Sequence, residues 1–444
     1  MALSTSLNQK PNIQPAEKHP KGLVVLFAVE MWERFGFYTI SSTLALYLRD
    51  PTRGLGWSEA SVVTLVSYFL MLVYASPLIG GWIADKVLGY RFAITIGGVL
   101  LGVGYFLLYF PPVTLLYLGL ALIVIGNGFF KPNVSTLVGN LYEEGSSLKD
   151  SAYNIFYMGI NTGAFMAPLV AEFVQQRLGF RAAFSGAGFG MIVSLLIFWS
   201  FRRWVEAKGT RTSYAQTEGS GAGSLSGKDS IEAVPDSWRV AALLVIFAIV
   251  IVFWMLFYQS TLTLIYFAND HTNWAAIGNV SGVLSAAINP FWIITLTFPL
   301  IAFWGWLDRR GLEPSTPAKM ALGMSLIGGA FYLMALASFS GGNAGRVSPW
   351  WLIAAYGIVS LGELMLSPMG LSLVSKVAPS RMRGLMMGAW FVALALGGKL
   401  TAIGVYWTVW SHSTFFAILA SMAMAMALLL WIVLKPLKKA MPGV

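Results

Sequence analysis

Residues 238–268 read WRVAALLVIFAIVIVFWMLFYQSTLTLIYFA, and no charged residue occurs between Val240 and Ala268. A helix needs about 20 apolar residues to cross the hydrocarbon core of a bilayer. This stretch is therefore long enough to span a membrane. Its apolar residues form one continuous block, for which the natural solvent is lipid.

The rest of the chain has the same character. Hydrophobic residues make up 57% of the 444, and charged residues only 11%, whereas soluble domains carry about a quarter charged residues to wet their surface. Cysteine is absent, and His19, His271 and His412 are the three histidines, with no two at metal-ligand spacing. We therefore expect no disulfide, metal or cofactor and no catalytic residue, and an enzyme is the least favoured class.

Apolar blocks of spanning length predict an all-α membrane protein. Twelve such blocks are found, near residues 23–48, 59–83, 92–110, 113–140, 151–177, 182–201, 238–268, 283–307, 318–338, 350–377, 385–409 and 412–434.

The net charge of +10 does not indicate nucleic acid as a partner, because the basic residues lie in alternate loops. With the N-terminus inside, 21 lysines and arginines fall on the cytoplasmic side and 5 outside. Cytoplasmic loops of membrane proteins collect these residues, so both termini are predicted to be cytoplasmic.

A polar stretch between the sixth and seventh blocks divides the chain. Residues 219–224 read GSGAGS, a composition typical of a flexible linker. The expected organisation is a cytoplasmic N-terminal tail (1–22), a six-helix bundle (23–201), a cytoplasmic linker (202–237), a second six-helix bundle (238–434) and a cytoplasmic tail (435–444).

A short repeat relates the two bundles. GWIADK at 81–86 follows the second block, and GWLDRR at 305–310 follows the eighth. Residues 81–91 resemble the loop signature of the major facilitator superfamily. The resemblance implies two six-helix bundles that rock to expose a midplane site to each side in turn.

Ionisable residues inside spans are costly and commonly functional. In the first span, Glu30, Arg34 and Tyr38 are spaced four apart and share one helix face, with Glu33 at its edge. Two carboxylates beside one guanidinium can share a proton, and its loss changes what Arg34 pairs with. A static pair that only neutralises Arg34 is the alternative.

Two further charges suggest a site with two poles. Lys131 in the fourth span needs a carboxylate or an anionic ligand, unless it extends to the interface. Glu363 in the tenth span suits a cationic amine, or else carries a proton or pairs helices. Lys399 in the eleventh span is a weaker candidate. An anion-binding pole facing a cation-binding pole fits a zwitterion.

These residues resemble the motifs of the proton-dependent oligopeptide transporter family. The first-helix motif ExxERFxYY is matched by residues 30–38, EMWERFGFY, with Phe37 replacing one tyrosine. Further matches are KPN at 131–133, FYMGIN at 156–161, INP at 288–290 and GELMLSP at 362–368.

The resemblance implies a role for each matching position. Arg34 and Lys131 would bind the peptide carboxylate, and Glu363 would face the amino terminus. The remaining implied roles are hydrogen bonds to the peptide from Asn161 and Asn289, side-chain pockets lined by Tyr38, Tyr74 and Trp390, and proton coupling by Glu30 and Glu33 together with Arg34.

Two positions depart from the family pattern. Bacterial members usually carry an acid in the seventh helix, where this chain has Tyr258, and an arginine at the position of Ser41. The two charges are missing together, so neither leaves an orphan buried partner. The departure puts proton coupling through the seventh helix in doubt.

The expected function is a monomeric, proton-coupled symporter of di- and tripeptides in a bacterial cytoplasmic membrane. Small peptides, protons and membrane lipid are its expected partners, and protons are the coupling ion. A transporter of nitrate or another organic anion with the same fold is the alternative, although Glu363 would then have no obvious role. A receptor or assembly partner is a third candidate, opposed by the repeat and the midplane charges.

Overall fold

The computed structural model describes residues 19–142, 148–205, 234–276, 278 and 280–442. Within these residues the chain is helical, and its β contact is an isolated bridge between Thr272 and Val347. The predicted all-α fold is therefore confirmed. Most of the predicted linker and N-terminal tail, 206–233 and 1–18, lies outside the described residues.

The first half is built from long helices joined by short turns. Its elements are α1 (Lys21–Arg49), α2 (Glu59–Ile83), the π-helical turn η1 (Ala84–Leu88), α3 (Tyr90–Leu107), α4 (Val113–Asn140), α5 (Leu148–Leu178), α6 (Phe180–Ser200) and α7 (Arg202–Val205).

The second half contains more 3-10 turns. Its elements are α9 (Asp236–Phe257), η2 (Tyr258–Thr261), α10 (Thr263–Asp270), η3 (Trp274–Ala276), η4 (Gly282–Ala287), α11 (Ile288–Asp308), α12 (Thr316–Ser340), α13 (Pro349–Val377), η5 (Ser380–Met382), α14 (Arg383–Leu400), η6 (Thr401–Thr408) and α15 (His412–Ala440).

Local sequence sets where several helices begin. The hydroxyl oxygens of Ser58, Ser348 and Ser411 accept backbone N–H groups at the starts of α2, α13 and α15, as N-cap residues do. Gly89 precedes α3 with φ of 73°, a left-handed conformation that favours glycine.

Ten helical segments of the described chain are long and apolar enough to cross a membrane. Many side chains on them are apolar yet exposed, such as Phe298 at 64% and Ile432 at 67%, as lipid-facing residues are. α1 and α5, with 29 and 31 residues, correspond to the first and fifth predicted spans. The count of twelve and the orientation of the termini stay predictions.

Two predicted spans are long and apolar enough to cross a membrane, but neither is one continuous α-helix. Residues 238–268 were expected to form one helix, but α9 ends at Phe257 and the chain passes through η2 and the irregular Leu262 before α10. Likewise 385–409 is α14 followed by the 3-10 segment η6. At the other end of the chain, α15 continues to Ala440, beyond the predicted boundary at residue 434.

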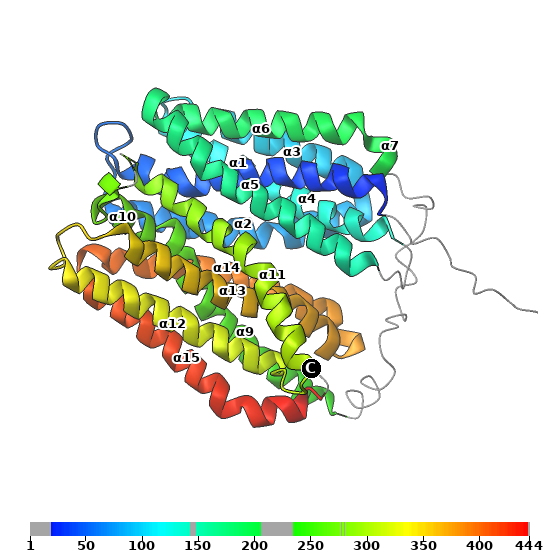
Figure 1. Cartoon of the computed structure of the whole chain (residues 1–444). Coiled ribbons are helices and arrows are strands. Elements are labelled where there is room, and N and C mark those ends of the chain that lie inside the picture. Colours follow the sequence, from blue (N-terminus) through cyan, green and yellow to red (C-terminus); the bar gives the residue numbers. More distant parts are fainter. Residues whose placement is uncertain (1–18, 143–147, 206–233, 277, 279, 443–444) are drawn as a thin grey trace, which may run out of the picture.

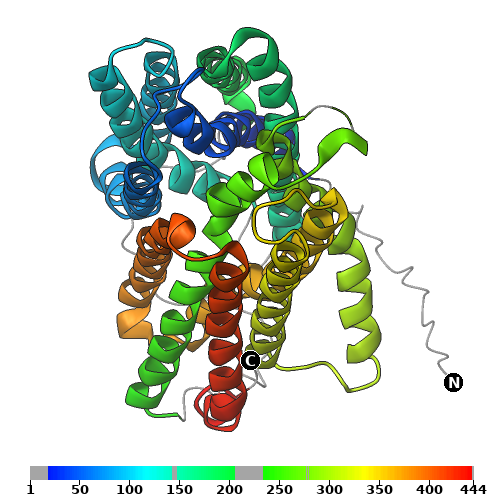
Figure 2. The ribbon, with the colours of Figure 1, turned by 90° about the vertical axis from the view of Figure 1, so that its left-hand side faces the viewer.

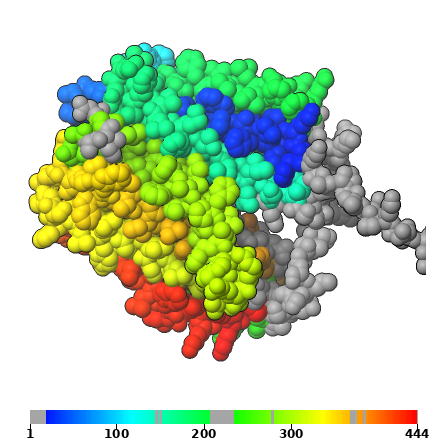
Figure 3. All heavy atoms as spheres, in the orientation of Figure 1, coloured from blue at the N-terminus to red at the C-terminus, as the bar shows by residue number. Residues whose placement is uncertain are grey.

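Two halves of the molecule lie against each other. α1–α7 form the upper part of Figure 1 and α9–α15 the lower part, and the turned view in Figure 2 shows the same division. α2 packs against α14 and η6, and α5 packs against η4 and α11. In Figure 3 the halves touch along the left and centre of the face, and the surface is hollowed between them on the right.

Within the first half, glycines let helices approach closely. A Cβ atom at Gly80 of α2 would lie 2.2 Å from the carbonyl oxygen of Gly128 in α4. Any side chain at Gly80 would therefore force the two helices apart. This close crossing fixes α4, with its charged residue Lys131, beside α2.

Candidate functional site

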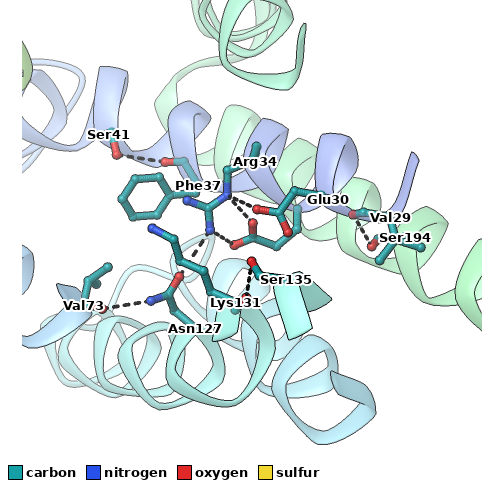
Figure 4. Close-up of polar contacts among 11 residues, drawn as sticks. Val29, Glu30, Arg34, Phe37, Ser41, Val73, Asn127, Lys131, Ser135 and Ser194 are labelled. Carbon is teal, nitrogen blue, oxygen red and sulfur yellow. Dashed lines mark hydrogen bonds and ion pairs between the residues drawn. The ribbon is translucent and has the colours of Figure 1, made fainter. Parts of the chain in front are cut away.

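The charged residues of α1 form a compact cluster. Arg34 donates from Nε and Nη2 to the two carboxylate oxygens of Glu33, the second bond at 2.6 Å. Its Nε also lies 3.3 Å from Glu30 Oε1. All three residues are at most 3% exposed, so the cluster is a buried pairing of two carboxylates with one guanidinium, as the spacing predicted (Figure 4).

Asn127 of α4 joins this cluster. Its Oδ1 accepts a hydrogen bond from Arg34 Nη2 at 3.3 Å, and its Nδ2 donates to the Val73 carbonyl oxygen of α2 at 2.9 Å (Figure 4). Sequence reasoning gave Asn127 no role, because its contacts with Arg34 and Val73 are visible only in the structure.

Lys131 lies one helical turn beyond Asn127 on α4. Its ammonium nitrogen is 5.1 Å from the centroid of the Tyr74 ring, within the range of a cation–π contact. Lys131 also interacts electrostatically with Arg34, Glu30 and Glu33. The structure therefore brings two cations and two carboxylates together, and we call these four residues the first-half pole.

Glu363 is the carboxylate that the second half contributes to the predicted site. Glu363 of α13 accepts from Asn289 Nδ2 of α11 at 3.0 Å, and the same nitrogen lies 2.9 Å from Ser360 Oγ. Glu363 is 9% exposed. We call Glu363, Asn289 and Ser360 the second-half pole; its acid has neutral partners rather than a cation.

Two tyrosines of the first half are within electrostatic range of Glu363 in the second-half pole. Tyr38 interacts electrostatically with Arg34 and with Glu363, and Tyr157 also interacts with Glu363. Asn161 Nδ2 donates to the Tyr157 carbonyl oxygen at 2.9 Å. Tyr38 is thus related to both poles, whereas the contact of Asn161 lies within α5, and the predicted roles of both residues stay predictions.

The other predicted aromatic residues differ in their surroundings. Tyr74 stacks on Tyr258 across the two halves, with ring centroids 5.1 Å apart. Trp390 is 2% exposed and packs against Phe247 of α9, 6.2 Å between centroids. In this structure Trp390 is part of the packed second half.

The two positions that depart from the family pattern are accommodated without charge. Ser41 Oγ donates to the Phe37 carbonyl oxygen at 2.9 Å. The Tyr258 ring also stacks on Trp254, 5.2 Å between centroids. An aromatic stack thus occupies the position at the start of η2, directly after α9, at which the family usually has an acid.

Polar contacts join the halves at the end of the molecule that holds the α1–α2 turn. Arg49 of α1 pairs with Asp270 of α10 and lies over the Tyr266 ring. Glu172 of α5 accepts from the Ser281 backbone nitrogen at 2.6 Å. Sequence reasoning missed these contacts, because neither partner is unusual for a loop or a helix end.

A third cross-half contact lies within the spans. Lys399 Nζ of α14 is 3.3 Å from Ser67 Oγ of α2 and 3.4 Å from the centroid of the Tyr68 ring. This lysine, the weaker candidate from the sequence, links helices rather than joining either pole. Among the described residues no group of three or more histidine, aspartate or glutamate side chains could hold a metal ion.

Known proteins are similar to this chain in sequence and in architecture. The model of the POT family matches residues 90–220 and 224–429. A dipeptide and tripeptide permease A of Proteus mirabilis is 33% identical over 89% of this chain and 88% of its own length. The permease of the same name from Escherichia coli is 32% identical over 88% of this chain and 85% of its own.

Solved structures of peptide transporters have the same fold as this chain. A crystal structure of a peptide transporter POT in complex with sulfate has a TM-score of 0.86 at 30% identity, covering 97% of both chains. Together with the ten long apolar helices, the bacterial permeases indicate a multi-pass protein of the bacterial inner membrane. Because the family model and the permeases match most of its length, this chain belongs to the POT family.

Proposed function

We propose that this protein is a symporter that imports di- and tripeptides together with protons by alternating access. One observation carries the proposal: two cations, Arg34 and Lys131, lie on one half, and the carboxylate of Glu363 lies on the other. A dipeptide carries one carboxylate and one amine at opposite ends. The permeases similar to this chain are named for dipeptides and tripeptides.

In this proposal each pole binds one end of the peptide. Arg34 and Lys131 receive the carboxylate, and Glu363, held by Asn289, receives the amine. Asn161 and Asn289 hydrogen-bond the peptide backbone or its termini. Tyr38, Tyr74 and Trp390 line the side-chain pockets, with Trp390 reaching the peptide only if the second half repacks.

Protons couple through the α1 acids. A carboxylate that gains a proton releases its share of Arg34, so binding of a proton at Glu30 or Glu33 changes how Arg34 meets the peptide. The two bundles 23–201 and 238–434 move as units in this cycle, and the linker 202–237 connects them on the cytoplasmic side. One chain is sufficient, with no cofactor besides the coupling proton.

The test is uptake of labelled dialanine into proteoliposomes, with and without an inward proton gradient. We expect accumulation with the gradient and only equilibration without it. A tenfold excess of unlabelled dipeptide should abolish uptake of the label, and an equal excess of nitrate should leave it unchanged.

Other outcomes separate the alternatives. Peptide exchange without peptide-dependent proton entry would leave a facilitated carrier. No uptake of dialanine, together with counterflow of nitrate, would support an anion transporter, in which Arg34 and Lys131 suffice. If no substrate moves in counterflow either, the chain is a receptor or an assembly partner.

A further inference from the structure

Pro77 leaves one carbonyl oxygen of α2 without its helical partner. The proline lies inside α2 (Glu59–Ile83) and has no backbone N–H to give to the residue four positions earlier. That residue is Val73. In a membrane span a freed carbonyl must find another donor, because lipid supplies none.

Asn127 supplies that donor. Its Nδ2 lies 2.9 Å from the Val73 carbonyl oxygen, and the side chain is 1% exposed. Ser76 Oγ also donates to this oxygen at 3.1 Å. Only the nitrogen side of an amide can donate to a carbonyl, so the bond to Val73 decides which way the Asn127 amide faces.

The other end of the amide is thereby aimed at Arg34. Asn127 Oδ1 accepts from Arg34 Nη2 at 3.3 Å. The same nitrogen gives its other hydrogen to Glu33. In the part of the chain that the structure describes, Nη1 has no hydrogen-bond acceptor, so this side of the guanidinium is left for a ligand.

Asn127 also relates the guanidinium to the second cation. Asn127 and Lys131 are four residues apart on α4, and residues at this spacing share a helix face. Two like charges repel and separate unless a fixed acceptor holds one of them. Asn127 holds Arg34 from the same helix that carries Lys131.

We propose that Asn127 is a positioning residue: it holds the Arg34 guanidinium beside Lys131 for a ligand carboxylate, in an orientation set by the Val73 carbonyl that Pro77 frees. The ligand carboxylate rests on the proposed peptide transport. The pairing of Pro77, Asn127 and Arg34 is a property of the fold and can be examined separately.

The first experiment compares KM and maximal rate in counterflow exchange for dialanine and for dialanine amide, which has no carboxylate. Asn127→Ala should raise the KM for dialanine about tenfold, with the maximal rate within about twofold of wild type. The KM for dialanine amide should stay unchanged. A general loss of structure would raise both or lower the rate instead.

A second pair of variants tests the link to Pro77. Pro77→Ala restores a backbone N–H for Val73, so the KM for dialanine should rise in the same direction but less, about threefold. The double variant Asn127→Ala with Pro77→Ala should be no worse than Asn127→Ala alone. Pro299→Ala, which removes a proline from inside α11, is the matched control and should leave both KM values unchanged.

Equal KM changes for the two ligands in Asn127→Ala, or independent effects of Asn127→Ala and Pro77→Ala, would overturn the proposal. If wild type exchanges no dialanine, the proposed function fails, and the structure of purified Asn127→Ala decides the positioning role. We expect the distance from Arg34 Cζ to Lys131 Nζ to be longer in Asn127→Ala than in wild type. An unchanged distance would refute the positioning role of Asn127.

Discussion

The two poles of the site hold their charges by different means. The first-half pole balances two carboxylates, Glu30 and Glu33, against Arg34 and Lys131, and an amide fixes the guanidinium. The second-half pole holds one carboxylate with the amide of Asn289, which is itself bonded to the Ser360 hydroxyl group. The ion pairs of the first-half pole can rearrange when one of the carboxylates gains a proton. Among the described side chains, the buried carboxylate held by a neutral amide has no cation that competes with the amine of a ligand.

The largest effect is expected where a proton would rearrange the first-half pole. Both oxygens of Glu33 are bonded to Arg34, whereas Glu30 Oε2 has no hydrogen-bond partner in the described chain. We therefore predict that the proton binds Glu30. Glu30→Gln should abolish accumulation of dialanine driven by a proton gradient while keeping counterflow exchange within about threefold of wild type.

Glu33→Gln is the matched variant, because it makes the same change of charge about one helical turn after Glu30 in α1. It should lower exchange as well as accumulation, because Arg34 loses its two-bond partner. The assignment is reversed if Glu33→Gln keeps exchange and Glu30→Gln does not.

Replacement of the guanidinium itself comes next. Arg34→Lys keeps the charge but loses the planar fork that bonds Glu33 at two points. Loss of one partner from a buried ion pair costs about 3–5 kcal/mol, and the retained charge should recover part of this. We expect the KM for dialanine exchange to rise about 100-fold.

Arg202→Lys on the short helix α7 is the control for this change, because Arg202 is exposed and lies over the Trp199 ring. It should leave the KM within about twofold of wild type. If Arg34→Lys changes the KM as little as Arg202→Lys does, a positive charge alone is sufficient for peptide binding at residue 34.

The second-half pole should respond to the amine of the ligand. A hydrogen bond to a charged group contributes about 1.5–3 kcal/mol, so Glu363→Gln should raise the KM for dialanine about 10- to 100-fold. N-acetyl dialanine has no charged amine and should bind wild type and Glu363→Gln equally.

Glu313→Gln is a suitable control, since Glu313 pairs with Lys319 near the end of the bundle. It should not distinguish the two ligands. If N-acetyl dialanine loses as much affinity as dialanine in Glu363→Gln, the acid does not face the amine.

The smallest effect concerns the ring beside Lys131. Tyr74→Phe keeps an aromatic face 5.1 Å from the ammonium and should change the KM for dialanine by less than about threefold. Tyr74→Leu removes a contact worth about 0.5–2 kcal/mol and should raise the KM several-fold. Equal effects of the two substitutions would assign the contribution to the hydroxyl group.

The sequence predicted long helices better than interruptions. The predicted bounds of α2 and α4 match the structure, because an apolar block ends where polar or proline residues begin. Hydropathy gave no sign that residues 238–268 leave the helix at Leu262, since apolar residues continue through the break. η2 and α10, on either side of Leu262, contact α1 of the other half, and hydropathy carries no information on such contacts.

The site shows the same contrast. Arg34, Lys131 and Glu363 could be found because a charge in an apolar run is costly and rare. Asn127 could not be assigned, since a neutral amide is common in spans. Its significance depends on a carbonyl of α2, which it meets 54 residues away along the chain.

The unequal charges of the two poles have a consequence for the transport cycle. Three carboxylates, Glu30, Glu33 and Glu363, face two cations, Arg34 and Lys131, so the empty site has one formal negative charge. One bound proton cancels that charge, and a zwitterionic peptide adds none. In the proposed symport with one proton, the loaded site would cross as a neutral unit and the empty site would return charged. A membrane potential of 100 mV, worth about 2.3 kcal/mol per charge, would act on that return and would govern how often an empty carrier becomes available outside.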